Sequence, residues 1–259
     1  MNENVAPQPQ LQLGTNTNRK LVRAVALFKQ HATEAGPVQA VNGVSLTVHA
    51  GEMVALVGPT GSGKTTLLGL LAGLEAPDQG QVFLLGQDLA GLTANELADL
   101  RGRAVGTVYQ SYNLFPGFTV RQNVGLPLRL MLRPPFDAHA RSGEILAELG
   151  LMGMAERFPA ELSGGQQQLV AIARSLAANP PLILADEPTA NLDSATARQI
   201  TARLRALADT GRHGVLLATH DLRTASQADR VLTLRDGQIV KETVLQPGRT
   251  GSQVLAELA

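Results

Sequence analysis

The chain of 259 residues contains no cysteine and no tryptophan, and only 3% of its residues are aromatic. The absence of cysteine excludes disulfide bonds, thiolate zinc sites and thiol nucleophiles, and it fits a reducing compartment. Basic and acidic residues are equal in number, so the formal net charge of zero gives no electrostatic signature of nucleic-acid binding. A hydrophobic fraction of 44% is enough for a core built mainly from leucine, valine and alanine.

Long apolar segments are also missing. No apolar run reaches the roughly 18 residues by which a membrane-spanning helix is recognised, so we expect the chain not to cross a membrane by itself. Residues 1–20 are rich in asparagine, glutamine and proline, and they lack the basic start and apolar stretch of a secretory signal. This composition predicts a disordered N-terminal tail.

Short apolar segments alternate with helical patterns over most of the chain. Val44, Leu46 and Val48 alternate with polar residues and predict a half-buried strand, which together with the apolar stretch at Leu21–Phe28 indicates an antiparallel piece. Further strands are predicted at Met53–Val57, Gln81–Leu85, Val105–Tyr109, Leu182–Ala185, Val215–Ala218 and Val231–Leu234, and a helix at Lys64–Ala72. This alternation implies a parallel sheet with helices on both faces and ligands at the carboxyl ends of its strands.

The segment from residue 111 to about residue 165 has a different character. Its prolines predict helices separated by breaks, and they are Pro116, Pro127, Pro134, Pro135 and Pro159. Ile145, Leu146, Leu149 and Leu151 give one of these helices an apolar face. We therefore predict a helical insertion within an α/β fold.

A glycine-rich loop follows the strand at Met53–Val57. Its glycines let the backbone turn so that several N–H groups face one anion, and the following helix points its positive end at the same place. Lys64 is expected to reach the β- and γ-phosphates of a nucleoside triphosphate, and Thr65 to hold Mg²⁺. The predicted ATP-binding residues of this loop are Gly58, Pro59, Thr60, Gly61, Ser62, Gly63, Lys64, Thr65 and Thr66.

Two acidic residues end a second buried strand. The strand at Leu182–Ala185 brings Asp186 and Glu187 to the sheet edge where the phosphate loop is expected. Asp186 suits Mg²⁺, directly or through water. Glu187 is placed to orient the attacking water or to accept its proton. Together with the phosphate loop, this pair predicts a site for the hydrolysis of a nucleoside triphosphate.

The phosphate loop, the run Leu162–Gln166 and the acidic strand end occur in an order that resembles the ATP-binding cassette (ABC) ATPases over roughly residues 21–241. The resemblance implies an α/β fold with a P-loop NTPase core on a parallel sheet, an antiparallel β subdomain, and an α-helical subdomain inserted at about residues 111–165. Residues 1–20 and 242–259 are then tails. The resemblance also assigns Gln110 to the Q-loop, Asp193 to the D-loop and His220 to the switch histidine.

The same resemblance implies a head-to-tail homodimer with two ATP molecules at its interface. It assigns catalysis to Glu187, His220 and Lys64, and Mg²⁺ binding to Thr65, Gln110 and Asp186. The signature residues Ser163, Gly164, Gly165 and Gln166 of one chain then meet the γ-phosphate held by the other chain, through N–H groups at a helix N-terminus. Asp193 connects the two sites, and Gln110 reports the nucleotide state to the helical insertion.

Finer matches at Tyr109–Pro116 and Thr119–Val124 resemble the lipoprotein-release and macrolide-export group of this family. The group implies a cytoplasmic subunit, peripheral on the inner face of the cell membrane, that drives a separate integral-membrane permease and does not bind nucleic acid. A non-transport ABC ATPase that powers an envelope or cell-division complex is the alternative, because it shares every site residue. A cassette ATPase acting on DNA is disfavoured by the lack of sustained heptads.

Two positions depart from the family pattern. His31 aligns with the aromatic residue, often tyrosine, that stacks on adenine, and Phe28 is the alternative for this contact. Leu169 stands where the family usually has arginine, just beyond the signature. Glu187 and His220 are both present, so we expect a hydrolysing rather than an inactive site.

Overall fold

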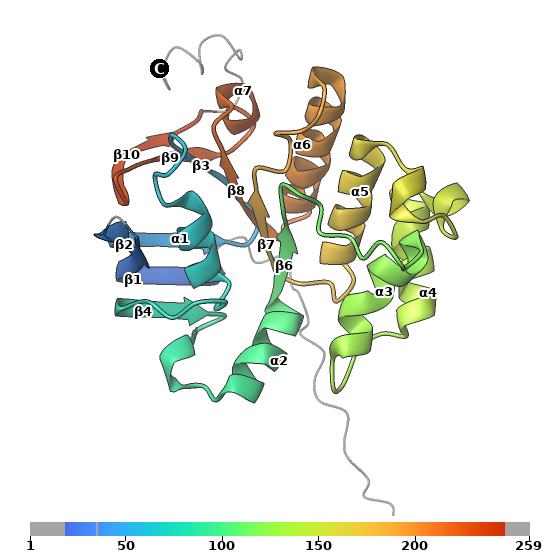
Figure 1. The fold of residues 1–259 in the computed structure, drawn as a ribbon, viewed down its shortest axis with the longest axis horizontal. Coiled ribbons are helices and arrows are strands. Elements are labelled where there is room, and N and C mark those ends of the chain that lie inside the picture. The colour runs from blue at the N-terminus through green and yellow to red at the C-terminus, as the bar shows by residue number, and fades with distance from the viewer. Residues whose placement is uncertain (1–18, 35, 247–259) are drawn as a thin grey trace, which may run out of the picture.

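The computed structural model of the chain describes residues 19–34 and 36–246 (Figure 1). The expected tails at 1–20 and 242–259 lie mostly outside these residues. Two sheets are present: a four-stranded one with strand order β2-β1-β4-β5 and a six-stranded one with order β10-β9-β3-β8-β7-β6. Helices flank the six-stranded sheet, so the predicted α/β class with a separate antiparallel part is confirmed.

The six-stranded sheet positions the candidate site. It consists of β3 (Met53–Val57), β6 (Val105–Val108), β7 (Leu182–Asp186), β8 (Gly214–Thr219), β9 (Arg230–Arg235) and β10 (Gln238–Val244). Neighbouring strands run parallel except β10, which pairs antiparallel with β9. Because Val244 still pairs with Arg230, β10 continues past the domain end expected at residue 241.

Both faces of this sheet are covered. Met53, Ala55 and Val57 of β3 belong to one hydrophobic core, and Val54 and Leu56 belong to another. The first core is completed by α5 (Gly164–Ser175), α6 (Ser194–Asp209) and α7 (Leu222–Ala225). The second is completed by α1 (Lys64–Leu71), α2 (Ala94–Ala104) and the antiparallel sheet. Covering on both sides explains why every residue of β3 is buried.

The antiparallel sheet contains β1 (Lys20–Thr33), β2 (Gly36–His49), β4 (Gln79–Leu84) and β5 (Gln87–Asp88). β1 extends beyond the apolar stretch at Leu21–Phe28 because it pairs with β2 as far as Thr33 and Gly36. The polar outer half of the strand has no apolar pattern, and for that reason the sequence did not show it. One consequence is that His31 lies on a strand.

The helical insertion contains α3 (Val120–Leu130) and α4 (Ala138–Glu148), with short 3-10 helices η2 (Met152–Met154) and η3 (Pro159–Glu161); a third, η1 (Leu89–Gly91), precedes α2. The prediction that Pro127 breaks a helix is wrong, because this residue lies inside α3. An interior proline costs about 3 kcal/mol. Val120, Val124 and Leu128 of α3 are fully buried, and burial stabilises by about 1.5–3 kcal/mol for each such side chain, which outweighs the cost.

Candidate functional site

The loops that carry the predicted site residues leave the six-stranded sheet at the same edge. Val57 of β3 pairs with Thr219 of β8, and Asp186 of β7 pairs with the preceding Ala218. The chain therefore turns into the phosphate loop, into Glu187 and into His220 at one level of the sheet. Val108 of β6 pairs with Ala185, which brings Gln110 to the same edge.

The phosphate loop needs its glycines. Gly61 and Gly63 have φ angles of 81° and 100°, which disfavour residues with a side chain. A Cβ atom at Gly63 would overlap the carbonyl oxygen of Ala40, and one at Gly58 would overlap that of Leu234. The Lys64 ammonium is curled over the loop, where it donates hydrogen bonds to the carbonyl oxygens of Gly58 (2.9 Å) and Pro59 (3.1 Å).

Thr65 and Asp186 meet although they are far apart in the sequence. The Thr65 hydroxyl donates to Asp186 Oδ2 at 2.8 Å, while Asp186 Oδ1 is buried without a hydrogen-bond partner. Burial raises the pKa of Asp186, the Thr65 hydrogen bond opposes this, and the nearby charge of Glu187 adds to it. A buried carboxylate oxygen without a partner, beside a hydroxyl, is the kind of hard oxygen donor set that suits Mg²⁺.

Asp186→Asn is expected to stabilise the nucleotide-free, metal-free protein increasingly as the pH rises. Because the folded-state pKa of Asp186 is raised, its contribution to stability is fully present below the ordinary aspartate pKa of about 4 and is lost as the pH rises through the folded-state value. Asparagine keeps the shape but does not ionise. Melting temperatures of both proteins from about pH 4 to about pH 7 should therefore diverge.

Asp193→Asn is the matched control for this measurement. Hydrogen bonds from the Thr196 side chain and backbone lower the pKa of Asp193, so this carboxylate contributes stability above its ordinary pKa and loses it as the pH falls. Relative to the parent, the asparagine variant should therefore lose stability as the pH rises towards about 4, and the difference should stay level from about pH 4 to about pH 7. The same pH trend in both variants would contradict the environment assigned to Asp186.

Glu187 is held between the other two predicted catalytic residues. Both of its carboxylate oxygens lie 3.0 Å from His220 Nδ1, and Oε1 lies 3.8 Å from Lys64 Nζ. Glu187 has a φ angle of 46°, a left-handed conformation that costs about 1–2 kcal/mol in a residue other than glycine. Strain of this kind persists where the surroundings hold it, as at functional sites. The structure thus brings Lys64, Glu187 and His220 together.

The contacts of Gln110 and His31 are with residues outside this cluster. The Asn191 side chain donates to the carbonyl oxygen of Gln110 at 3.3 Å, which joins the D-loop to the Q-loop. His31 Nε2 lies 3.3 Å from the Thr66 hydroxyl, next to the phosphate loop. The Phe28 ring instead packs against Gly43. Of the two proposed adenine contacts, His31 is the one beside α1.

The signature forms the N-terminus of α5. Ser163 is the N-cap residue: its hydroxyl accepts from the Gln166 N–H (3.3 Å), while its own N–H donates to Gln166 Oε1 (2.9 Å). Gly164 and Gly165 follow in the first turn with no room for larger residues, because a Cβ at Gly165 would lie 2.5 Å from Thr196 Cγ2. Within the described residues, the signature makes none of the contacts that join Lys64, Glu187 and His220.

The sequence analysis assigned no role to two residues of the site region. Arg174 donates to the carbonyl oxygens of Tyr112 and Asn113, just beyond the Q-loop glutamine. Asn123 holds the following loop, since its side chain bonds the backbone N–H and carbonyl of Phe115. Both contacts join a helix to an irregular loop, so no periodic pattern marks them.

The fold and site together define a P-loop ATPase cassette. The sequence profile described as "ABC transporter" matches residues 41–190. The lipoprotein-releasing system ATP-binding protein LolD of Pseudomonas fluorescens is 46% identical over 209 residues, covering 80% of this chain and 92% of that protein. The chain belongs to the ABC transporter family of ATP-binding proteins. This confirms the predicted family, its lipoprotein-release and macrolide-export group, and the ABC-type ATPase class.

Two further similarities bear on this assignment. The macrolide export ATP-binding/permease protein MacB of Azoarcus sp. is 40% identical over 228 residues, which cover 88% of this chain but only 35% of that protein. A solved dimeric structure of the cassette MJ0796, in a post-hydrolysis state bound to ADP and Pi, has a TM-score of 0.80 and 36% identity. This comparison covers 87% of the present chain and 99% of that one. The cassette fold and its ATP binding are thus supported by sequence and structure alike.

Proposed function

We propose that the chain is a nucleotide-binding subunit that closes as a homodimer around two ATP molecules and drives an integral-membrane permease. The observation that carries this is the division of the site. Lys64, Glu187 and His220 form one cluster, whereas among the described residues no hydrogen bond or ion pair joins Ser163 and its neighbours at the start of α5 to that cluster. A second chain placed head to tail supplies the missing half, and the dimeric MJ0796 cassette supports this arrangement.

Within one chain, the phosphate loop binds ATP. Lys64 exchanges its carbonyl partners for the β- and γ-phosphates, and Thr65, Asp186 and Gln110 would hold Mg²⁺. Bound by these residues, the ion would supply positive charge that offsets the negative charge developing on the transferred phosphoryl group. His31 contacts the base from its place beside Thr66.

Glu187 then orients the attacking water and accepts its proton. His220, bonded to both carboxylate oxygens, fixes the direction of this base and approaches the γ-phosphate. Ser163, Gly164, Gly165 and Gln166 of the second chain close the site with backbone N–H groups at the positive end of α5. Asp193 caps α6 and holds Thr196 against Gly165, so it connects the D-loop to the signature of its own chain.

An apolar surface beside the Q-loop is proposed as the contact with the permease. Phe115 and Phe118 stack at 5.5 Å between ring centroids and are 50% and 37% exposed. They follow Gln110 by five and eight residues, so a partner helix seated on them is coupled to the nucleotide site through this short stretch of backbone. Bound to the permease in this way, the chain would lie peripherally on the inner face of the membrane. None of the helices in residues 19–34 and 36–246 is long and apolar enough to cross a membrane.

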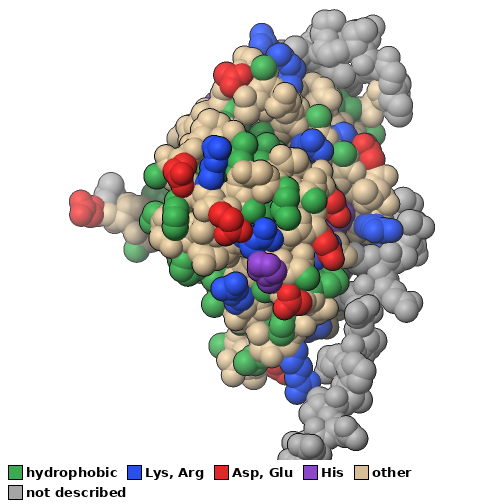
Figure 2. Space-filling model, turned by 90° about the vertical axis from the view of Figure 1, so that its right-hand side faces the viewer, with side chains coloured by type: hydrophobic (Ala, Val, Ile, Leu, Met, Phe, Trp, Pro, Cys, Tyr) green, Lys and Arg blue, Asp and Glu red, His purple; other side chains and the backbone are tan. Residues whose placement is uncertain are grey.

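Nucleic acid is not proposed as a partner. Figure 2 shows the side of the molecule formed by the helical insertion, where acidic and basic side chains are interspersed with hydrophobic ones. A nucleic-acid surface would concentrate lysine and arginine on one face. The LolD protein of Pseudomonas fluorescens, 92% of whose length is covered, is named as part of a lipoprotein-releasing system, which supports transport as the activity of this subunit.

Turnover per chain is expected to rise with protein concentration, because a complete site needs two chains. At saturating ATP and Mg²⁺, phosphate release per chain should increase at least about tenfold from well below to well above the dimer dissociation constant, and then level off. Lys64→Ala provides the background rate. Constant turnover per chain over the same range, with the protein monomeric by sedimentation, would contradict the divided site.

A further inference from the structure

We propose that Arg174 is a positioning residue that locks the turn after the Q-loop to the signature helix, so that Gln110 and Gly164 keep a fixed relation in each chain. Arg174 lies in the last turn of α5, the helix whose first turn carries the signature. The inference deepens the proposed function and rests on it, because a fixed signature matters only where it closes a partner's site.

The turn held by Arg174 has an unfavourable backbone conformation. Tyr112 and Asn113 have φ angles of 58° and 49°, two consecutive left-handed residues that are not glycine. Such conformations persist only where the surroundings determine them. The Arg174 guanidinium supplies this constraint, because Nη2 donates to the carbonyl oxygen of Tyr112 at 2.8 Å and Nη1 donates to that of Asn113. A planar fork with two donors fits two successive carbonyls, which a lysine ammonium does not reproduce.

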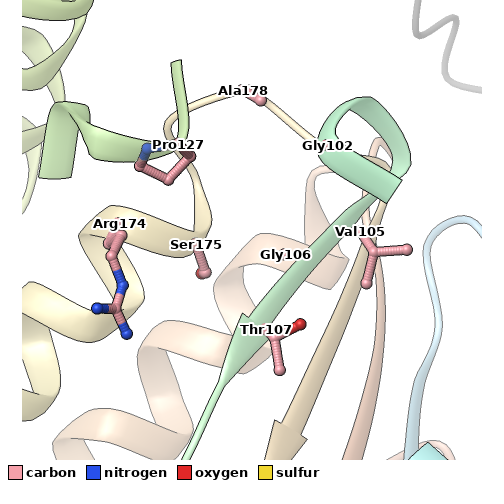
Figure 3. A pocket seen from close by; sticks show the side chains of 8 residues that line it. All are labelled: Gly102, Val105, Gly106, Thr107, Pro127, Arg174, Ser175 and Ala178. Carbon is pink, nitrogen blue, oxygen red and sulfur yellow. The ribbon is translucent and has the colours of Figure 1, made fainter. Parts of the chain in front are cut away.

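Arg174 reaches this turn because α5 lies very close to β6. A Cβ atom at Gly106 would overlap the carbonyl oxygen of Ser175, so only glycine permits this approach. Arg174 and Ser175 of α5 and Gly106 and Thr107 of β6 line one pocket, as Figure 3 shows. The volume of this pocket is about 90 Å³. The guanidinium is half-buried, and burial lowers its pKa although it stays a cation.

The same turn touches the other end of α5. A Cβ atom at Gly164 would lie 2.9 Å from the Tyr112 hydroxyl oxygen, so the tyrosine side chain lies against the first turn of the signature helix. Tyr112 is thus fixed by its carbonyl at Arg174 and by its ring at Gly164. Asn191 completes the connection by donating to the carbonyl oxygen of Gln110. A movement of the Q-loop therefore shifts the signature of the same chain.

The test separates dimer closure from nucleotide binding. In a Glu187→Gln background, Arg174→Met should weaken the ATP-dependent dimer at least about tenfold by sedimentation, which corresponds to about 1.4 kcal/mol. Binding of a fluorescent ATP analogue to the monomer should change less than about twofold, because the phosphate loop is intact. Arg174→Lys should lie between parent and Arg174→Met, and Tyr112→Phe, which keeps the fold of the turn, should weaken the dimer in the same direction.

Arg101→Met is the matched control, since Arg101 also donates to a loop carbonyl, that of Gly73. It should leave the dimer unchanged. If Arg174→Met leaves the dimer affinity of the Glu187→Gln protein unchanged, the inference is overturned and the proposed function is not. The same holds if Arg174→Met weakens ATP binding to the monomer as much as it weakens the dimer. If Arg174→Met does not fold, the Arg174→Lys and Tyr112→Phe variants decide the question. In each, the loss of dimer affinity should again exceed the loss of ATP binding to the monomer. If the Glu187→Gln protein without a further substitution stays monomeric with ATP, both the proposed function and this inference are overturned.

Discussion

Glu187→Gln is expected to lower ATP turnover at least about a hundredfold and to leave the protein as a stable ATP-bound dimer. Loss of a positioned general base typically removes a factor of about 10² to 10⁴ in rate. Glutamine keeps the shape of Glu187 and its neighbours Lys64 and His220, so nucleotide binding is preserved. ATP then remains intact between the two chains and holds them together.

The measurement combines phosphate release with sedimentation at saturating ATP. Glu242→Gln is the control, because Glu242 pairs with Arg230 at 2.8 Å, and Arg230 begins β9 at the edge of the sheet opposite to the catalytic cluster. It should keep both turnover and the monomer–dimer exchange of the parent. A Glu187→Gln protein that stays monomeric with ATP, or that hydrolyses it at the parent rate, would refute the role given to this carboxylate.

Ser163→Asp is expected to abolish hydrolysis while leaving the chain folded and able to bind ATP. Aspartate caps a helix as well as serine does, so the melting temperature should change little. Its negative charge, however, would face the γ-phosphate held by the partner. We expect at least about a hundredfold loss of turnover, equivalent to about 2.7 kcal/mol, with less than about a twofold change in binding of ATP to the monomer.

Mixing this variant with Lys64→Ala tests whether the signature acts on the other chain. A mixed dimer contains one site with an intact phosphate loop from the first chain and an intact signature from the second. Random pairing makes half of the dimers mixed, so activity should recover to at most about a quarter of the parent value. Activity equal to the sum of the two separate variants would show that each signature serves its own nucleotide.

Contiguous motifs made the phosphate loop predictable from the sequence. Gly61 and Gly63 have positive φ angles that favour glycine, so the backbone geometry of the loop can be inferred from the residue types in the sequence. Asp186 and Glu187 were predictable only together with the phosphate loop, because two acids at the end of a strand are by themselves as often ordinary surface residues. The fold class followed from the same alternation of strands and helices.

Contacts between distant segments were not predictable. Arg174 and Tyr112 are 62 residues apart and meet only because Gly106 lets α5 approach β6 closely. Pro127 misled for a related reason, since its local propensity was overridden by the burial of the apolar face of α3. The position of His31 depends on how far β1 pairs with β2, which its polar sequence does not show.

The most direct test of the divided site is the structure of the Glu187→Gln protein crystallised with ATP and Mg²⁺. We predict a head-to-tail dimer in which each ATP lies on Lys64 and Thr65 of one chain. Ser163 Oγ and the Gly165 N–H of the other chain should then lie within about 3 Å of its γ-phosphate oxygens. A nucleotide enclosed by a single chain, with both signatures remote from phosphate, would contradict the division of the active site between two chains.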